Sequence, residues 1–255
     1  MPPPAADAPC PEQAFNATAL KWHTCAWLLL PVLVFLAGWM HWYAALPLTL
    51  LMAAGLTPRK RKEPQTRDSL PAFPLFTRSS FLALAAFAAL MALSGWGEWV
   101  NQHPDHIVRN ACLCELVASP WPVIFPDGNV LIYNTGFWLV PALAGKLAGL
   151  DAARVLVVLW GTWGLFLSWL WLCVFSGRRS LLLALLMAAF GSLLNFQCWL
   201  GLDLFRLHYF GTAEQIMCSA NASIPVLLFF IFLASGRMPL YWMPILFAAT
   251  AFYSP

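Results

Sequence analysis

Long apolar runs alternate with short polar segments along this chain. The apolar runs cover residues 25–56, 81–96, 131–150, 152–175, 181–200, 216–234 and 240–254. A helix of roughly 20 apolar residues crosses a bilayer core about 30 Å thick. The pattern therefore predicts an all-α fold, a polytopic transmembrane helical bundle with about six or seven spans.

The first apolar run is too long for one upright span. Residues 25–56 carry no charge, and a single helix over them would be about 48 Å long. The run is interrupted at "GWMHWY", so we expect a transmembrane hairpin of two short helices, with one long tilted span as the alternative. Residues 1–24 are proline-rich and acidic where a signal peptide would be basic, and we expect a disordered tail there.

Basic residues indicate which side of the membrane each loop occupies. The segment 57–79 contains Arg59, Lys60, Arg61, Lys62, Arg67 and Arg78. By the positive-inside rule this loop is cytoplasmic. The run 81–96 then leads outward, and alternating spans return the chain to Arg178, Arg179 and Arg237 on the cytoplasmic side.

The run 131–150 is long enough to span, but a crossing there would place Arg178 and Arg179 outside. It also contains Pro141 and Lys146. We therefore expect an interfacial helix. The resulting outer loop, residues 97–151, has an amphipathic helix at each end and a turn at "FPDGN". Residues 80–255 form the transmembrane core.

The most polar part of this loop is "GEWVNQHPDHIVRNACLCEL", residues 97–116. Pro104 suits a helix start, and the helix dipole favours Asp105 in the first turn. Asp105 and Arg109 are four residues apart and can form an ion pair, and His106 and Asn110 share that spacing. An ionised carboxylate at headgroup depth can act as a general base. The alternative is an ordinary helix cap with a surface ion pair.

Composition excludes several classes of protein. The chain is 61% hydrophobic with a mean hydropathy of +0.71, unlike soluble globular proteins. Its net charge of +3 is too small to indicate nucleic-acid binding. The seven cysteines show no metal-site spacing. We expect no cofactor, although a divalent metal shared by His103, Asp105 and His106 is an alternative.

The outer loop resembles that of a known family. The acidic stretch at Asp105, the "SPWPV" segment at 119–123 and the Pro-containing "LVPALAGKLAG" at 139–149 follow one another. This order is similar to the first outer loop of GT-C class integral-membrane glycosyltransferases, such as protein mannosyltransferases and the lipid A aminoarabinose transferase. The likeness covers residues 80–180. The two apolar segments before the basic loop are additional, and no second acid stands beside Asp105.

The resemblance implies transfer of a sugar from a polyprenyl-phosphate donor to an acceptor at the outer face of a bacterial inner membrane. Asp105 would be the catalytic base. The candidates for binding substrate or phosphate are His106, Arg109, Asn110, Lys146, Arg154 and Arg206. Asp203 and Glu214 are further acidic candidates in the second outer loop. Family members continue with more helices, so we expect the chain to be an N-terminal fragment.

A non-enzymatic polytopic protein, either a transporter component or an assembly scaffold, is the rival class. Transporters place ionisable residues inside their spans. Here the charges gather in loops, which counts against solute transport and leaves an assembly scaffold as the alternative.

Overall fold

A computed structural model describes residues 17–57, 77–100, 102, 104–189 and 212–253. Within these ranges the protein is helical, and its one isolated β-bridge joins Ile124 to Val130. The expected all-α class is confirmed. The helices are α1 (Ala17–Trp39), α2 (Trp42–Leu56), α3 (Arg78–Leu93), α4 (Pro104–Ala118), α5 (Gly136–Ala148), α6 (Leu150–Ser176), α7 (Leu181–Ala189), α9 (Thr212–Ala234), the short 3-10 helix η3 (Leu240–Trp242) and α10 (Met243–Tyr253).

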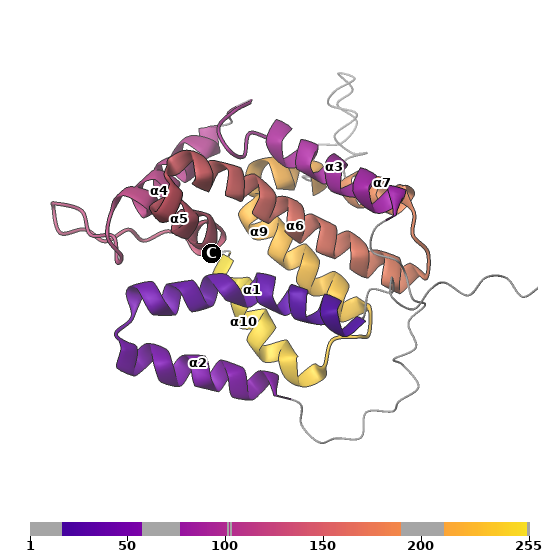
Figure 1. Ribbon diagram of the computed structural model, residues 1–255, viewed down its shortest axis with the longest axis horizontal. Coiled ribbons are helices and arrows are strands. Elements are labelled where there is room, and N and C mark those ends of the chain that lie inside the picture. Colours follow the sequence, from indigo (N-terminus) through magenta and orange to yellow (C-terminus); the bar gives the residue numbers. More distant parts are fainter. Residues whose placement is uncertain (1–16, 58–76, 101, 103, 190–211, 254–255) are drawn as a thin grey trace, which may run out of the picture.

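The first apolar run forms two helices, separated at Met40 and His41. In Figure 1, α1 and α2 lie side by side and run in opposite directions. Of the two alternatives, the structure therefore shows two short helices in a hairpin and not one long helix. Helix α1 begins at Ala17, so residues 17–24, expected to be part of a disordered tail, are helical.

The ends of the helices gather at two ends of the bundle (Figure 1). At one end, Arg179 Nη1 donates to Ser80 Oγ at 3.3 Å, which joins the α6–α7 turn to the start of α3. At the same end, Trp242 Nε1 donates to the Leu56 carbonyl at 3.0 Å. Arg78 begins α3, Arg178 and Arg179 lie between α6 and α7, and Arg237 lies between α9 and η3. These parts of the chain lie at the same end in Figure 1. We call it the basic end.

The opposite end contains the α4–α5 region. Glu98, just after α3, forms an ion pair with Arg154 in the first turns of α6, so α3 ends where α6 begins. Every described segment between these two helices lies at this end in Figure 1. The acidic residues of this region are Glu98, Asp105, Glu115, Asp127 and Asp151. We call it the acidic end.

The position of α5 follows from the same geometry. It has 13 residues and is about 20 Å long, which is shorter than a bilayer core. Since α3 ends and α6 begins at the acidic end, α5 is not needed to carry the chain across the bundle. It packs most extensively on α6 and also contacts α1 and α4.

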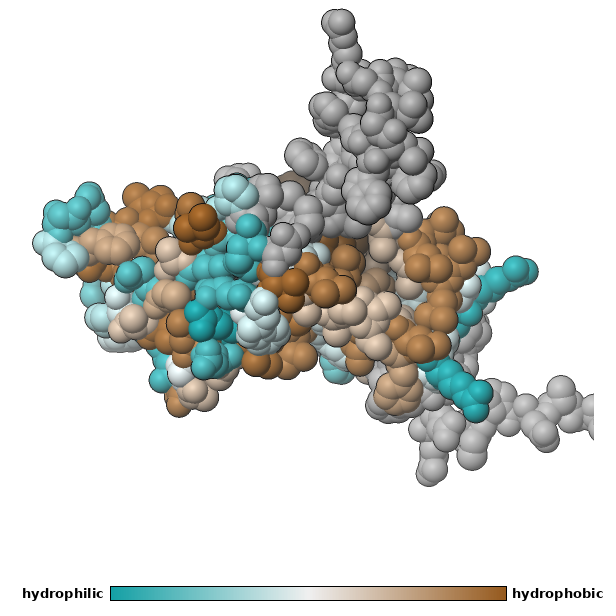
Figure 2. Space-filling model, turned by 90° about the horizontal axis from the view of Figure 1, so that it is seen from above, coloured by the Kyte–Doolittle hydropathy of each residue, from teal (hydrophilic) through white to brown (hydrophobic). Residues whose placement is uncertain are grey.

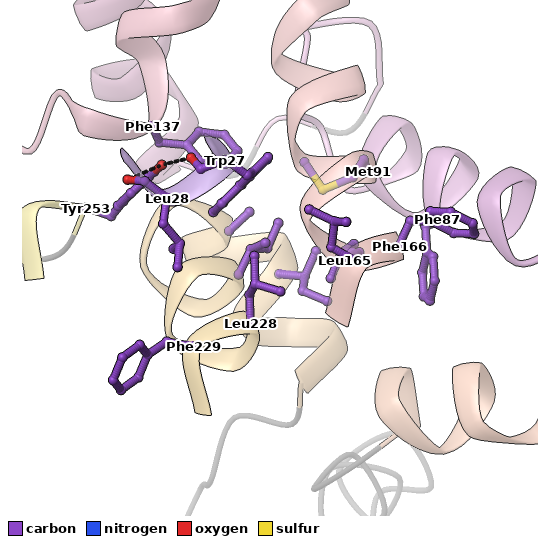
Figure 3. Packing of buried hydrophobic residues seen from close by; sticks show 14 of the residues in the cluster. Trp27, Leu28, Phe87, Met91, Phe137, Leu165, Phe166, Leu228, Phe229 and Tyr253 are labelled. Carbon is purple, nitrogen blue, oxygen red and sulfur yellow. Dashed lines mark hydrogen bonds between the residues drawn. The ribbon is translucent and has the colours of Figure 1, made fainter. Parts of the chain in front are cut away.

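Helix α6 is the centre of the bundle, because α1, α3, α5 and α9 all pack on it. Two neighbouring helices approach α6 closely at Gly164. A Cβ there would lie 2.6 Å from an Ile224 methyl and 2.7 Å from the Trp27 ring. Glycine thus lets α1 and α9 approach α6. Figure 3 shows the buried residues around this contact.

A hydrogen bond between helices compensates for a proline in α1. Pro31 has no N–H, so it cannot donate to the carbonyl of Trp27 four residues earlier. The buried Tyr253 hydroxyl in α10 donates to that carbonyl at 2.7 Å (Figure 3). The Tyr253 and Trp27 rings also stack, with centroids 5.4 Å apart. The α1–α10 contact is therefore specific as well as apolar.

Among the described helices, two are long and apolar enough to cross a membrane, over Thr18–Trp39 and Leu150–Ser176. The other apolar helices are shorter, and a bundle of six or seven spans remains a prediction. Figure 2 shows hydrophobic residues over much of one face, and hydrophilic residues gathered in its left half, which holds α4, α5 and the start of α6.

Candidate functional site

Trp96 anchors the acidic end. It follows α3, is buried, and donates from Nε1 to the Ile216 carbonyl of α9 at 2.8 Å. Its ring contacts His106 of α4 and Phe137 of α5, with centroids 5.2 and 5.4 Å away. One side chain therefore joins the end of α3 to α4, α5 and α9.

Asp105 and Arg109 form the predicted ion pair, with Nη2 3.8 Å from Oδ2. The Asp105 side chain is 54% exposed, whereas that of Arg109 is 9% exposed. The guanidinium lies over the Trp96 ring, 5.6 Å from its centroid, and donates to Ser219 Oγ at 3.4 Å. Arg109 is thus held by Trp96, which follows α3, and by Ser219 of α9, whereas the Asp105 carboxylate is open to solvent.

The two other polar candidates of α4 have structural contacts. His106 is fully buried and its ring meets the edge of Trp96. Asn110 Nδ2 donates to Gln102 Oε1 at 2.8 Å, and Gln102 donates in turn to the carbonyls of Gly95 and Val100. Asn110 therefore ties the segment after α3 to α4, and His106 has no surface available for a ligand.

Arg154 lies between two carboxylates. It contacts Glu98 through Nη2 and Asp151 through Nη1, the latter at 3.0 Å. Glu98 has a positive φ of 69°, next to Gly97, which also has a positive φ. Such a backbone is uncommon outside glycine and marks a position worth testing for function. No role was predicted for Glu98 from the sequence. The two glycines of "GWGE", directly after an apolar helix, were the feature that could have indicated it.

Lys146, in α5, lies against the C-terminal end of α4, whereas Asp105 lies at the N-terminal end of that helix. Its Nζ donates to the carbonyls of Val117, at 3.5 Å, and Ser119, and it sits over the Trp121 ring, 5.0 Å from the centroid. Lysine near a helix C-terminus satisfies carbonyls that have no intrahelical partner. From Asp105 to Val117 the helix rises about 18 Å. Lys146 is therefore well separated from Asp105.

The remaining candidate residues lie outside the described residues or have no described side chain. Asp203 and Arg206 are outside the described residues, and Glu214 lies in α9 without a described side chain. His103 is also outside the described residues. Among those that are described, no group of three His, Cys, Asp or Glu side chains is arranged to hold a metal ion.

Cys112 and Cys114 are free thiols on α4. Burial raises the pKa of Cys112 to about 12. Burial also raises the pKa of Cys114, and the nearby Glu98 carboxylate adds to the increase. A thiol with a raised pKa is a poor nucleophile at neutral pH, so neither cysteine is suited to catalysis.

Comparisons with models of known protein families, with curated protein sequences and with solved structures find no match to this chain.

Proposed function

We propose that this protein is a GT-C type membrane glycosyltransferase, which moves a sugar from a polyprenyl-phosphate donor to an acceptor at the outer face of the membrane. The observation that carries the proposal is the exposed Asp105 carboxylate beside the buried Arg109 guanidinium. This pairing puts a proton acceptor and a phosphate-binding group side by side at one end of an apolar bundle. The likeness of the outer loop to that family supports the same function.

The charge distribution supports a membrane orientation. The described residues at the basic end include Arg78, Arg178, Arg179 and Arg237, and the positive-inside rule assigns this end to the cytoplasm. The acidic end then faces outward. Helix α4 exposes Ile107 and Val108 beside Asp105, as a helix lying at a membrane interface would.

In the proposed reaction, Asp105 accepts the proton of the acceptor hydroxyl. The hydroxyl oxygen forms a bond to the anomeric carbon of the sugar. The bond from that carbon to the donor phosphate oxygen breaks, and polyprenyl phosphate leaves with the bonding electrons. Arg109, which pairs with Asp105, offsets the charge of the leaving phosphate.

The other cations are less suited to this step. Base and leaving group flank one sugar ring, whereas Lys146 contacts α4 about 18 Å from Asp105. Arg154 is already paired with two carboxylates. Glu98 is the second candidate base, but its side chain is 20% exposed against 54% for Asp105, so it is less accessible to an acceptor.

The test is to incubate the full-length protein in lipid with a panel of polyprenyl-phosphate sugars and to measure transfer. Asp105→Asn keeps the side-chain shape but removes the base, so turnover should fall by about 10²- to 10⁴-fold. Asp127→Asn, at the exposed turn after α4, is the matched control and should stay active.

Two results would count against the assignment. If Asp105→Asn retains full activity while Glu98→Gln is inactive, Glu98 is the base. If the wild-type protein transfers no sugar from any donor, the transferase proposal fails and the non-enzymatic alternative stands.

A further inference from the structure

An apolar groove runs along the side of the bundle near the acidic end. Its lining combines the second half of α1, the segment after α4, and α5: Leu33, Val34, Ala37, Gly38, Trp121 and Leu143. Its volume is about 390 Å³, within the range of ligand sites. Leu33, Ala37 and Leu143 are exposed, so the groove opens to the side of the bundle.

Trp121 closes the groove at the acidic end and connects it to a charge. One contact of its ring is with Trp39 of α1, at a centroid distance of 4.9 Å. Another is with the Lys146 ammonium, 5.0 Å from the centroid. The exposed rings of Trp42 and Tyr43 follow Trp39 in the chain, and exposed aromatic residues of this kind mark headgroup depth.

Lys146 differs from the other cations of the acidic end. Arg109 and Arg154 each pair with a carboxylate, but no carboxylate among the described residues lies within 4 Å of the Lys146 ammonium. Two carbonyls accept from Nζ, which has three N–H donors. One donor and the positive charge are left for an anion.

We propose that this groove binds a phospholipid of the surrounding bilayer, with an acyl chain along α1 and α5 and the phosphate at Lys146. The apolar lining selects a hydrocarbon chain, and the cation at its end selects an anionic headgroup. The proposal uses the membrane setting proposed above but not the transferase activity, because Lys146 is remote from Asp105. The donor lipid at Asp105 is a different ligand.

The test uses the whole chain purified in a mild detergent and native mass spectrometry with three probes: phosphatidylglycerol, diacylglycerol and inorganic phosphate. The wild-type protein should bind phosphatidylglycerol best and inorganic phosphate least. Ala37→Trp fills the groove and should weaken phosphatidylglycerol binding at least about tenfold, the effect of losing roughly two buried methylenes. Ala53→Trp, on an exposed face of α2, is the matched control and should bind as the wild type does.

The cation is tested separately. Lys146→Gln should weaken phosphatidylglycerol binding roughly fivefold and leave diacylglycerol binding unchanged, since it removes one cation at headgroup depth. Lys146→Arg should retain binding, and Arg178→Gln, at the basic end, should have no effect. Equal binding by wild type and Ala37→Trp, or equal affinity for phosphatidylglycerol and diacylglycerol, would overturn the proposal. A protein that binds phosphatidylglycerol but transfers no sugar would fail the proposed function alone.

Discussion

Replacing Tyr253 with phenylalanine should isolate the hydrogen bond that compensates for Pro31. The phenylalanine ring would keep the stacking on Trp27 and lose only the hydroxyl that donates to the Trp27 carbonyl at 2.7 Å. That carbonyl has no donor at position 31, because Pro31 lacks an N–H. The substitution therefore removes a buried hydrogen bond and leaves its acceptor without this donor.

The magnitude follows from these contacts. Leaving a buried acceptor unsatisfied costs about 1–3 kcal/mol. In a chain of this size each kcal/mol lowers Tm by about 2–4 °C. A loss of about 2 kcal/mol should then lower the Tm of Tyr253→Phe by about 4–8 °C, measured by circular dichroism in detergent. Tyr43→Phe, at an exposed tyrosine, should leave Tm unchanged.

A double-mutant cycle makes the test specific. Pro31→Ala restores an N–H that can bond the Trp27 carbonyl within α1. In that background Tyr253→Phe should cost clearly less than it does alone. Equal costs in the two backgrounds, or an unchanged Tm in the single variant, would refute the role assigned to the hydroxyl.

Three further predictions concern the site and the core. Arg109→Met removes a guanidinium held over an aromatic ring and should lower Tm by about 4–8 °C. Asp105→Asn changes only the half-exposed partner of that ion pair and should lower Tm by less than about 2 °C. Equal shifts in Tm would contradict the burial of Arg109. Gly164→Val should destabilise the bundle by about 1–3 kcal/mol or more through overpacking, and Gly161→Ala, which meets a flexible methionine end, should cost less; thermal unfolding of both variants compares them. With Cys112 as the only cysteine, maleimide labelling below pH 9 should be at least about 1,000-fold slower than for an exposed thiol, and fast labelling would show that this side chain is not buried.

The features that the sequence predicts correctly depend on residues close together in the chain. The helix starting at Pro104 and the Asp105–Arg109 pair follow from local capping and i,i+4 spacing, and both are confirmed. The all-α class follows from the apolar runs. The number of spans depends on a bilayer, and it stays a prediction.

The contacts that define the site join distant segments and could not be read from spacing. Arg109 is buried because Ser219, 110 residues later, and Trp96 enclose it. The Glu98–Arg154 pair joins residues 56 positions apart. Lys146 was expected in an interfacial helix, and the family resemblance made it a phosphate candidate. Its position beside the C-terminal end of α4 depends on how α4 and α5 pack.

Cysteine labelling from outside intact cells tests most directly whether the acidic end faces outward and the basic end faces the cytoplasm. In a background without native cysteines, a thiol at position 126, in the exposed turn of the acidic end, should react with a membrane-impermeant maleimide. Thiols at positions 65 and 178 should react only after the membrane is permeabilised. If positions 65 and 178 are labelled in intact cells and position 126 is not, the bundle has the opposite orientation. The proposed site would then not lie at the outer face.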